Sequence, residues 1–148
     1  MSVLGRVATL TPTTTLQYST TYTAAIAPGV MDLQGNTTTY SYSWSFTTVE
    51  PPDGTPPTVT SVAPLAGAVD VAIGASVVAT FSEAVDPATV TLTLRDGFDT
   101  LVSAAVSTSG SVATLTPSTA LLYATTYTAR VAAGVKDLAG NPMTADYL

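Results

Sequence analysis

The sequence predicts an all-β protein built from antiparallel β-sandwiches in tandem. Thr and Val are abundant and alternate with apolar residues, and both residue types favour pleated, half-buried surfaces. Ten Gly and ten Pro are spread along the 148 residues, which leaves little room for long helices. Residues 7–43 recur as 112–148 with 23 identities in 37 ungapped positions. The offset, from Val7 to Val112, is far longer than the roughly 20–50 residues of a solenoid repeat and therefore indicates a repeated domain.

The repeat and one proline-rich segment predict the domain boundaries. Residues 49–57 (VEPPDGTPP) hold four prolines, which stiffen a connector and remove backbone donors. We therefore expect the C-terminal half of one repeat at 1–48, a linker at 49–57 and a second repeat at 58–148. The strand-like segment from Trp44 to Thr48 has no counterpart in the second copy, because its equivalent would begin one residue after Leu148. The sequence thus predicts a second domain that lacks its last strand.

Alternation with a period of two predicts the strands of the second copy and their buried faces. Val77, Ala79 and Phe81 are expected to face inward, and residues 90–95 and 127–132 carry apolar side chains at every second position. Further strands are expected at 58–63, 101–108 and 111–116. Short strands separated by turns at this spacing are typical of an antiparallel sandwich.

The repeat provides an internal check on the last of these strands. Inward Tyr127, Ala129 and Val131 are matched in the first copy by the similar residues Tyr22, Ala24 and Ile26. Outward Arg130 is matched by Ala25, a change that a buried position would not accept without cost. Residues 86–89 predict a single helical turn, with Asp86 as its cap and Pro87 in its first position.

Composition excludes several classes of partner. Charged residues form 9% of the chain and the net charge is −6, with four basic residues. A chain without a basic patch is a poor ligand for nucleic acid or an anionic membrane. No apolar run approaches the roughly 20 residues that span a bilayer. The chain has no Cys, which fits a reducing compartment and fits equally an extracellular protein that depends on core packing instead of disulfides. We expect no nucleic-acid partner and no membrane insertion.

Several segments, taken in order, carry a family resemblance. The second copy opens on Pro56-Pro57-Thr-Val-Thr, then has a Pro-x-x-Gly turn at 64–67 and a Phe-Ser-Glu phrase at 81–83. It closes on a Leu-x-Tyr-x-x-x-Tyr phrase at 121–127 and an Asp-x-x-Gly-Asn turn at 137–141, and the first copy adds a Trp-x-Phe strand at 44–46. This combination resembles the bacterial Ig-like domains of the SbsA type, first recognised in S-layer proteins. The resemblance implies an immunoglobulin-like Greek-key sandwich, neighbouring Ig-like repeats as partners, and a secreted or cell-surface location.

The motif residues have structural interpretations. Tyr127 follows Leu121 by six residues at the start of a strand and looks like a tyrosine corner, whose hydroxyl bonds to upstream backbone. Tyr22 is its equivalent in the first copy. Trp44, Phe46 and Phe81 are expected to be structural aromatic side chains as well.

The two Asp-x-x-Gly-Asn turns are the only candidate metal sites. Asp32 with Asn36, and Asp137 with Asn141, supply oxygens of the kind that Ca²⁺ binds. A calcium site needs about six to eight oxygens, and each turn holds a single carboxylate. A plain turn, with the Asp side chain accepting local amides, is the favoured interpretation, so no metal and no cofactor is expected.

No set of residues predicts catalysis. Glu83 and Asp86 are close in sequence, with Asp96 and Asp99 in a later loop, and paired carboxylates hydrolyse glycosides when one has a raised pKa in a cleft. The chain has no His to activate its many hydroxyls, and Lys136 stands alone in a turn that we expect to be exposed. Solvated loop acids are the simpler interpretation, and we predict no enzyme.

Two function hypotheses follow. The leading one is a non-enzymatic spacer module of a large bacterial secreted or cell-surface protein, which supports domain presentation, adhesion or surface-layer assembly. The alternative is an accessory carbohydrate-binding module of an extracellular polysaccharide-active enzyme. In that case Tyr40, Tyr42 and Trp44 would stack on glycan, although the same spacing also places all three on one core face.

The missing last strand leads to a further expectation. An open sheet edge recruits strands, and the segment from Trp44 to Thr48 has the sequence that would fill the vacancy. Within one chain, eight or nine connecting residues reach at most ~30 Å, about the length of the sandwich. We therefore expect donation between chains, giving a strand-exchanged homodimer or polymer. A monomer with a loosely ordered N-terminal half is the alternative.

Overall fold

The computed structural model describes residues 1–148, which divide into two compact units, Met1–Pro52 and Asp53–Leu148. The boundary falls inside the proline-rich segment at 49–57. Pro57 is fully buried within the second unit, so the end of this segment packs as part of that unit and is not free connector.

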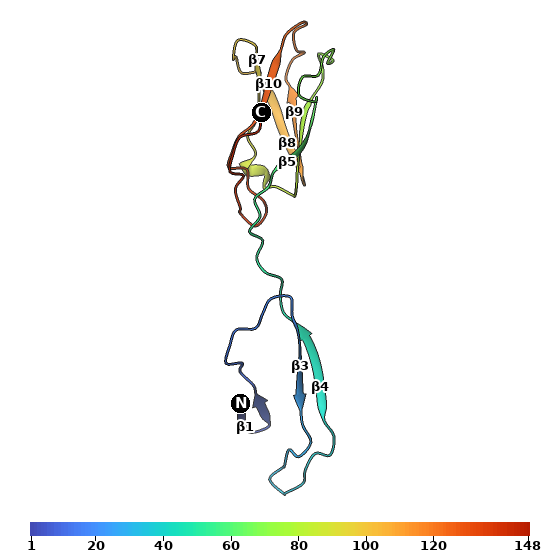
Figure 1. Ribbon diagram of the computed structural model, residues 1–148, viewed down its shortest axis with the longest axis vertical. Coiled ribbons are helices and arrows are strands. Elements are labelled where there is room, and N and C mark those ends of the chain that lie inside the picture. Colours follow the sequence, from blue (N-terminus) through green and yellow to red (C-terminus); the bar gives the residue numbers. More distant parts are fainter. The chain divides into compact units, whose positions relative to one another are not determined.

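The second unit is an antiparallel β-sandwich (Figure 1). One sheet has four strands in the order β5-β6-β9-β8, and the other pairs β7 with β10. All pairings are antiparallel, and a single 3-10 turn, η1, is the only helical element. The all-β fold class is thus confirmed. The bounds are β5 (Val59–Ala63), β6 (Val77–Phe81), η1 (Pro87–Thr89), β7 (Leu92–Asp96), β8 (Ala104–Ser109), β9 (Val112–Pro117) and β10 (Tyr127–Val131).

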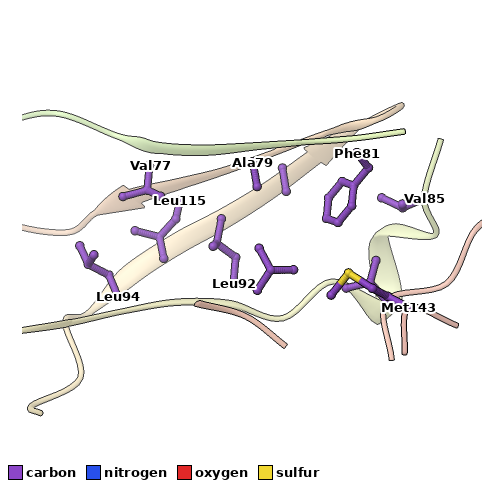
Figure 2. Packing of buried hydrophobic residues seen from close by; sticks show 11 residues of the cluster. Val77, Ala79, Phe81, Val85, Leu92, Leu94, Leu115 and Met143 are labelled. Carbon is purple, nitrogen blue, oxygen red and sulfur yellow. The ribbon is translucent and has the colours of Figure 1, made fainter. Parts of the chain in front are cut away.

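The hydrophobic core of the second unit lies between its two sheets. Figure 2 shows side chains from β6 directed toward Leu92 and Leu94 of β7, with Leu115 of β9 among them. The predicted inward faces are confirmed, because Val77, Ala79 and Phe81 are buried whereas Val78 and Thr80 between them are not. The same alternation holds for β7 and β10. The core consists of Val77, Ala79, Phe81, Val85, Leu92, Leu94, Ala113, Leu115, Val131, Val135 and Met143.

Local side-chain hydrogen bonds set the ends of several elements. Asp86 caps η1 by accepting the Ala88 amide at 3.0 Å, as its sequence predicts. Asp96 likewise accepts the amides of Phe98 and Thr100, both at 2.9 Å. The strand expected at 101–108 starts later, because Leu101 bridges Arg95 and the Val102 amide donates to the Leu94 carbonyl at 2.9 Å, so β8 begins only at Ala104.

The first unit contains two hairpin-like pairs (Figure 1). They are β1 (Ser2–Leu4) with β2 (Val7–Thr9), and β3 (Thr21–Ile26) with β4 (Tyr42–Thr47). Their register repeats that of the second unit. Leu4 pairs with Val7, and the residues at the equivalent positions of the second copy, Ser109 and Val112, pair in the same way. β1, β2 and β3 therefore correspond to β8, β9 and β10.

No residue of the first unit is buried. Tyr22, Ala24 and Ile26, expected to face inward, share one face of β3 but remain partly or fully exposed. Trp44 and Phe46 on β4 are 46% and 45% exposed. The physical reason is that this unit holds only two two-stranded sheets, whereas the equivalent strand β10 lies over a four-stranded sheet with a filled core.

Candidate functional site

Both tyrosine corners form the same hydrogen bond. The hydroxyl of Tyr127 accepts the backbone N–H of Leu122 at 2.9 Å, and that of Tyr22 accepts the backbone N–H of Gln17 at 3.0 Å. Each ring thereby ties the start of its strand to the loop five residues upstream. The loops match in conformation, since Ser19 and its equivalent Ala124 have left-handed φ angles of 47° and 50°.

The two Asp-x-x-Gly-Asn turns are also built alike. Asp32 Oδ1 accepts the Asn36 amide at 2.8 Å and its Oδ2 accepts the Asn36 side chain at 2.9 Å. Asp137 does the same with Asn141, at 2.8 and 2.7 Å. Gly35 and Gly140 adopt φ angles of 90° and 98°, a region that only Gly enters without strain. Lys136 is exposed beside the second turn.

Only the second turn belongs to a carboxylate cluster. Oxygens of Asp53, Glu83 and Asp137 all lie within 4.8 Å of one another. Asp137 is 3% exposed, and the Asn141 side chain also donates to the backbone carbonyl of Asp53 at 3.1 Å. Asp53 was missed by sequence reasoning, because it lies far from the turn in sequence and no local pattern marks it. Glu83 meets these two residues, whereas Asp86, its expected neighbour, caps η1 instead.

The environment shifts the acidities of this cluster in opposite directions. Burial, followed by the negative charges of Asp53 and Asp137, raises the pKa of Glu83 above its ordinary value. Burial alone would also raise the pKa of Asp137, but hydrogen bonds from the side chain and backbone of Asn141 and from neighbouring amides outweigh it and lower that pKa. The cluster therefore combines one carboxyl group whose charged form is favoured by hydrogen bonds with one whose charged form is disfavoured by burial and by neighbouring charge.

Three neighbouring carboxylates are typical ligands of a divalent cation, but some of their oxygens already accept hydrogen bonds from the protein. Both oxygens of Asp137 already accept hydrogen bonds from Asn141. A calcium ion takes about six to eight oxygens, more than the remaining carboxylate oxygens offer. The isolated Asp32 turn has still fewer, and its carboxylate is engaged in the same way. Asp96 accepts amides of its own turn, and Asp99 pairs with Arg95 at 3.6 Å.

An apolar groove of about 960 Å³ opens into the second unit. Core residues from β6 and β7, including Val77 and Leu94, form part of its lining, together with Leu122 and Ala129 near β10. β10 borders this groove with an edge that is almost free of partners. Only Val131 is paired there, through reciprocal backbone hydrogen bonds with Tyr147 at 3.0 and 2.9 Å.

Aromatic side chains gather on β4 of the first unit. The rings of Tyr42 and Trp44 lie 5.8 Å apart and are tilted by 41°, while Phe46 stacks on Tyr22 at 6.0 Å. Tyr40, just before the strand, is 86% exposed. These rings are solvent-accessible and neutral. Exposed aromatic side chains of this kind are expected on a ligand-binding face, or on the face of a sheet that packs against another element.

Comparison with known proteins identifies one family. A family model described as a bacterial Ig-like domain matches residues 1–48 and again 53–148. No curated protein gives a significant match. The structure has no helix that is long and apolar enough to cross a bilayer.

Proposed function

This chain belongs to the bacterial Ig-like domain family, and we propose from this premise that it is a non-enzymatic structural module of a large bacterial secreted or cell-surface protein. Domains of this family occur in bacterial surface proteins and are typically non-catalytic. The module would space and present neighbouring domains, further Ig-like repeats among them, in adhesion or in surface-layer assembly of the SbsA type.

The observation that carries this proposal is the duplication of cohesive contacts. The tyrosine hydroxyl bond and the Asp–Asn turn are built twice, in the same geometry, in two units of which only the second has a buried core. Many hydroxyls pair with each other across strands, as Thr21 does with Thr47 at 2.8 Å and Thr23 with Ser45 at 2.9 Å. Side chains repeated for cohesion support a mechanical role.

A pulling experiment tests the structural role. The intact chain, held at both ends in a force spectrometer, is expected to show one cooperative rupture from residues 53–148, because the core lies there. Its contour gain should approach about 3.3–3.6 Å per released residue. Gradual extension without a rupture would contradict a module that resists force.

A turnover screen tests the non-enzymatic part of the proposal. Polysaccharides and chromogenic glycosides incubated with the chain should stay intact. Hydrolysis that Glu83→Gln abolishes, while Glu50→Gln leaves it unchanged, would overturn the proposal. These are the only two glutamates of the chain, so they form a matched pair.

Glycan binding is a second candidate, favoured by the exposed neighbouring rings of Tyr42 and Trp44. Under this alternative the chain would be an accessory carbohydrate-binding module of a polysaccharide-active enzyme, since aromatic faces stack on sugars. Affinity electrophoresis in gels containing polysaccharide separates the two candidates. Retardation of the chain that Tyr42→Ala removes, and that Tyr123→Ala on the other unit does not, would favour the carbohydrate-binding module.

A further inference from the structure

Strand β8 forms one edge of the four-stranded sheet and has a partner on one side only. It comes last in the order β5-β6-β9-β8, and its residues pair with β9 along the whole strand. No other backbone hydrogen bond reaches Ala104–Ser109. This edge is separate from β10, because Leu101, just before β8, bridges Arg95 of β7, and β10 pairs with the other edge of β7. β8 therefore presents unpaired N–H and C=O groups, which are a template for a further strand.

The other edge strands of this unit carry features that oppose strand addition, as the edges of natural sheets usually do. β5 has a register shift near its start and is bounded by Pro57 and Pro64. β7 and β10 each carry an arginine, Arg95 and Arg130, which forms an ion pair with a nearby aspartate. A bulge, a proline or a charge at an edge hinders pairing with another chain.

β8 has none of these features. Its sequence, AAVSTS, contains no proline and no charge, and it pairs with β9 in an unbroken register. The absence of charge extends beyond the strand, because no residue from 100 to 129 is acidic or basic. Like charges directly opposite each other destabilise a strand pair. Two copies of β8 would meet without any such repulsion, so the edge is compatible with itself.

One apolar side chain lies exposed in the middle of this edge. Val106 pairs with Leu115 of β9, so the two side chains lie on the same face of the sheet, which is the core face. Leu115 is 1% exposed, whereas Val106, one strand nearer the edge, is 42% exposed. A strand added at this edge would cover part of Val106, and removal of apolar surface from water favours the contact.

We propose that β8 of one copy of the chain pairs antiparallel with β8 of a second copy, which joins the two four-stranded sheets into one. A two-fold axis perpendicular to the sheet relates the copies, as in most homodimers. Residues that face each other must share a face of the joined sheet, and the register that places Val106 opposite Val106 brings the two exposed valines together. Ala104 then lies opposite Thr108. The pairing adds lateral self-association to the structural role proposed above.

The geometry predicts a weak dimer. β8 is six residues long, which is about 20 Å at 3.4 Å per residue. One strand pair of this length, with a single apolar contact at its centre, falls below the roughly 1,200 Å² of stable interfaces. Two-fold pairing uses the β8 edge of both copies, so the assembly is closed. Self-association should therefore depend on concentration and end at the dimer.

Analytical ultracentrifugation of the intact chain, from micromolar to millimolar concentration, tests the proposal. The average mass should rise from monomer to dimer and then stay constant. A monomer at every concentration, or assemblies larger than the dimer, would overturn it.

A matched pair of substitutions tests whether β8 forms the contact. Val106→Lys places a charge in the middle of the edge, where two copies would bring like charges together. Val69→Lys makes the same change at a loop residue that is 82% exposed. The association constant of the dimer should fall at least tenfold for Val106→Lys and stay unchanged for Val69→Lys. Equal effects of the two substitutions, or no effect of either, would contradict a contact through β8.

Cysteine cross-linking tests the register and introduces no charge into the sandwich. The chain has no Cys, so an introduced thiol is the only one present. Directly opposite residues of antiparallel strands have Cα atoms about 4.5–5.5 Å apart, which suits a disulfide. Val106→Cys should therefore give a disulfide-linked dimer under mild oxidation.

A second cysteine on the same strand is the control for chance collisions. Ser109→Cys also places a thiol at an exposed position of β8. In the proposed register the two copies of residue 109 lie roughly 20 Å apart along the edge, too far for a disulfide. Cross-linking of both variants at equal rates would overturn the proposed pairing.

The edge contact and the proposed function fail separately. A chain that stays monomeric would leave the turnover screen and the pulling experiment on single molecules unaffected. Glycan hydrolysis by the chain, in turn, would leave the pairing of β8 strands and its cross-linking test unaffected.

Discussion

At the scale of single residues, the tyrosine hydroxyls are the clearest link between sequence and stability. Tyr127→Phe removes only the oxygen that accepts the Leu122 amide. We expect the free energy of unfolding to fall by about 1 kcal/mol, the usual net contribution of one hydrogen bond. Urea denaturation monitored by circular dichroism measures it. Tyr123→Phe is the control, because the Tyr123 ring is 81% exposed. An equal loss in the control would show that ring solvation, and not the hydrogen bond, causes the effect.

The contribution of Glu83 to the free energy of unfolding should depend on pH with the opposite sign from that of a carboxylate in an ion pair. Its pKa in the folded state lies above the ordinary value of 4.5, so the folded protein binds the proton more tightly than the unfolded chain does. The contribution of the group to stability is then fully present below pH 4.5 and is lost as pH rises through the folded-state pKa.

Glu83→Gln should consequently raise the free energy of unfolding at pH 7, and the gain should shrink to nothing as the pH falls below 4.5. Thermal denaturation at a series of pH values checks this, with Glu50→Gln as the control for loss of a glutamate charge. If Glu83→Gln instead lowers the free energy of unfolding at pH 7 when calcium is present, the prediction is wrong, because the carboxylates would then hold a cation.

At the scale of elements, the repeat places one sequence in two environments. Residues 7–12 and 112–117 are both VATLTP, yet Leu115 is 1% exposed in β9 and its equivalent Leu10 is 70% exposed. Leu115→Ala should cost about 2–5 kcal/mol of unfolding free energy, as truncations in a packed core do. Leu10→Ala should change it by less than about 0.5 kcal/mol, as surface substitutions do.

Chemical denaturation of both leucine variants measures the difference. Because residues 7–12 and 112–117 are identical, a difference between the two variants reflects their surroundings and not their immediate sequence neighbours. Equal losses in both would mean that the first unit is packed in solution in a way that its own strands do not account for.

Element boundaries were less predictable than element faces. The inward sides of β6, β7 and β10 follow from alternation, because side-chain direction in a strand has a period of two. The start of β8 at Ala104 does not, because Leu101 and Val102 pair with β7 before the chain pairs with β9. β4 begins at Tyr42, two residues before the predicted Trp44, because its partner β3 extends to Ile26.

At the scale of the whole molecule, stability should be distributed unequally between the units. The entire buried core belongs to Asp53–Leu148, and a pair of isolated hairpins is marginally stable in water. In hydrogen exchange, amides of β6 and β9 should be protected to the level of global unfolding, while those of β3 and β4 exchange orders of magnitude faster. Protection of β3 comparable with that of β9 in a dilute monomer would contradict this prediction.

The sequence by itself determined what depends on neighbours along the chain. Strand faces, the cap on η1 and the two Asp–Asn turns are local, since each needs only a few consecutive residues in the right order. In the structure the repeated sequences also pair in equivalent registers, β1 with β2 as β8 with β9.

Only the tertiary structure decided which of the repeated residues are buried and which acids meet. Leu115 is enclosed because β6, β7 and β8 surround it, and Leu10 lacks such a cover within its unit. Asp53, Glu83 and Asp137 form a cluster because packing brings three distant segments together. The burial of a residue and the charges near it depend on segments that are distant in the sequence, and these segments meet only when the two sheets pack together.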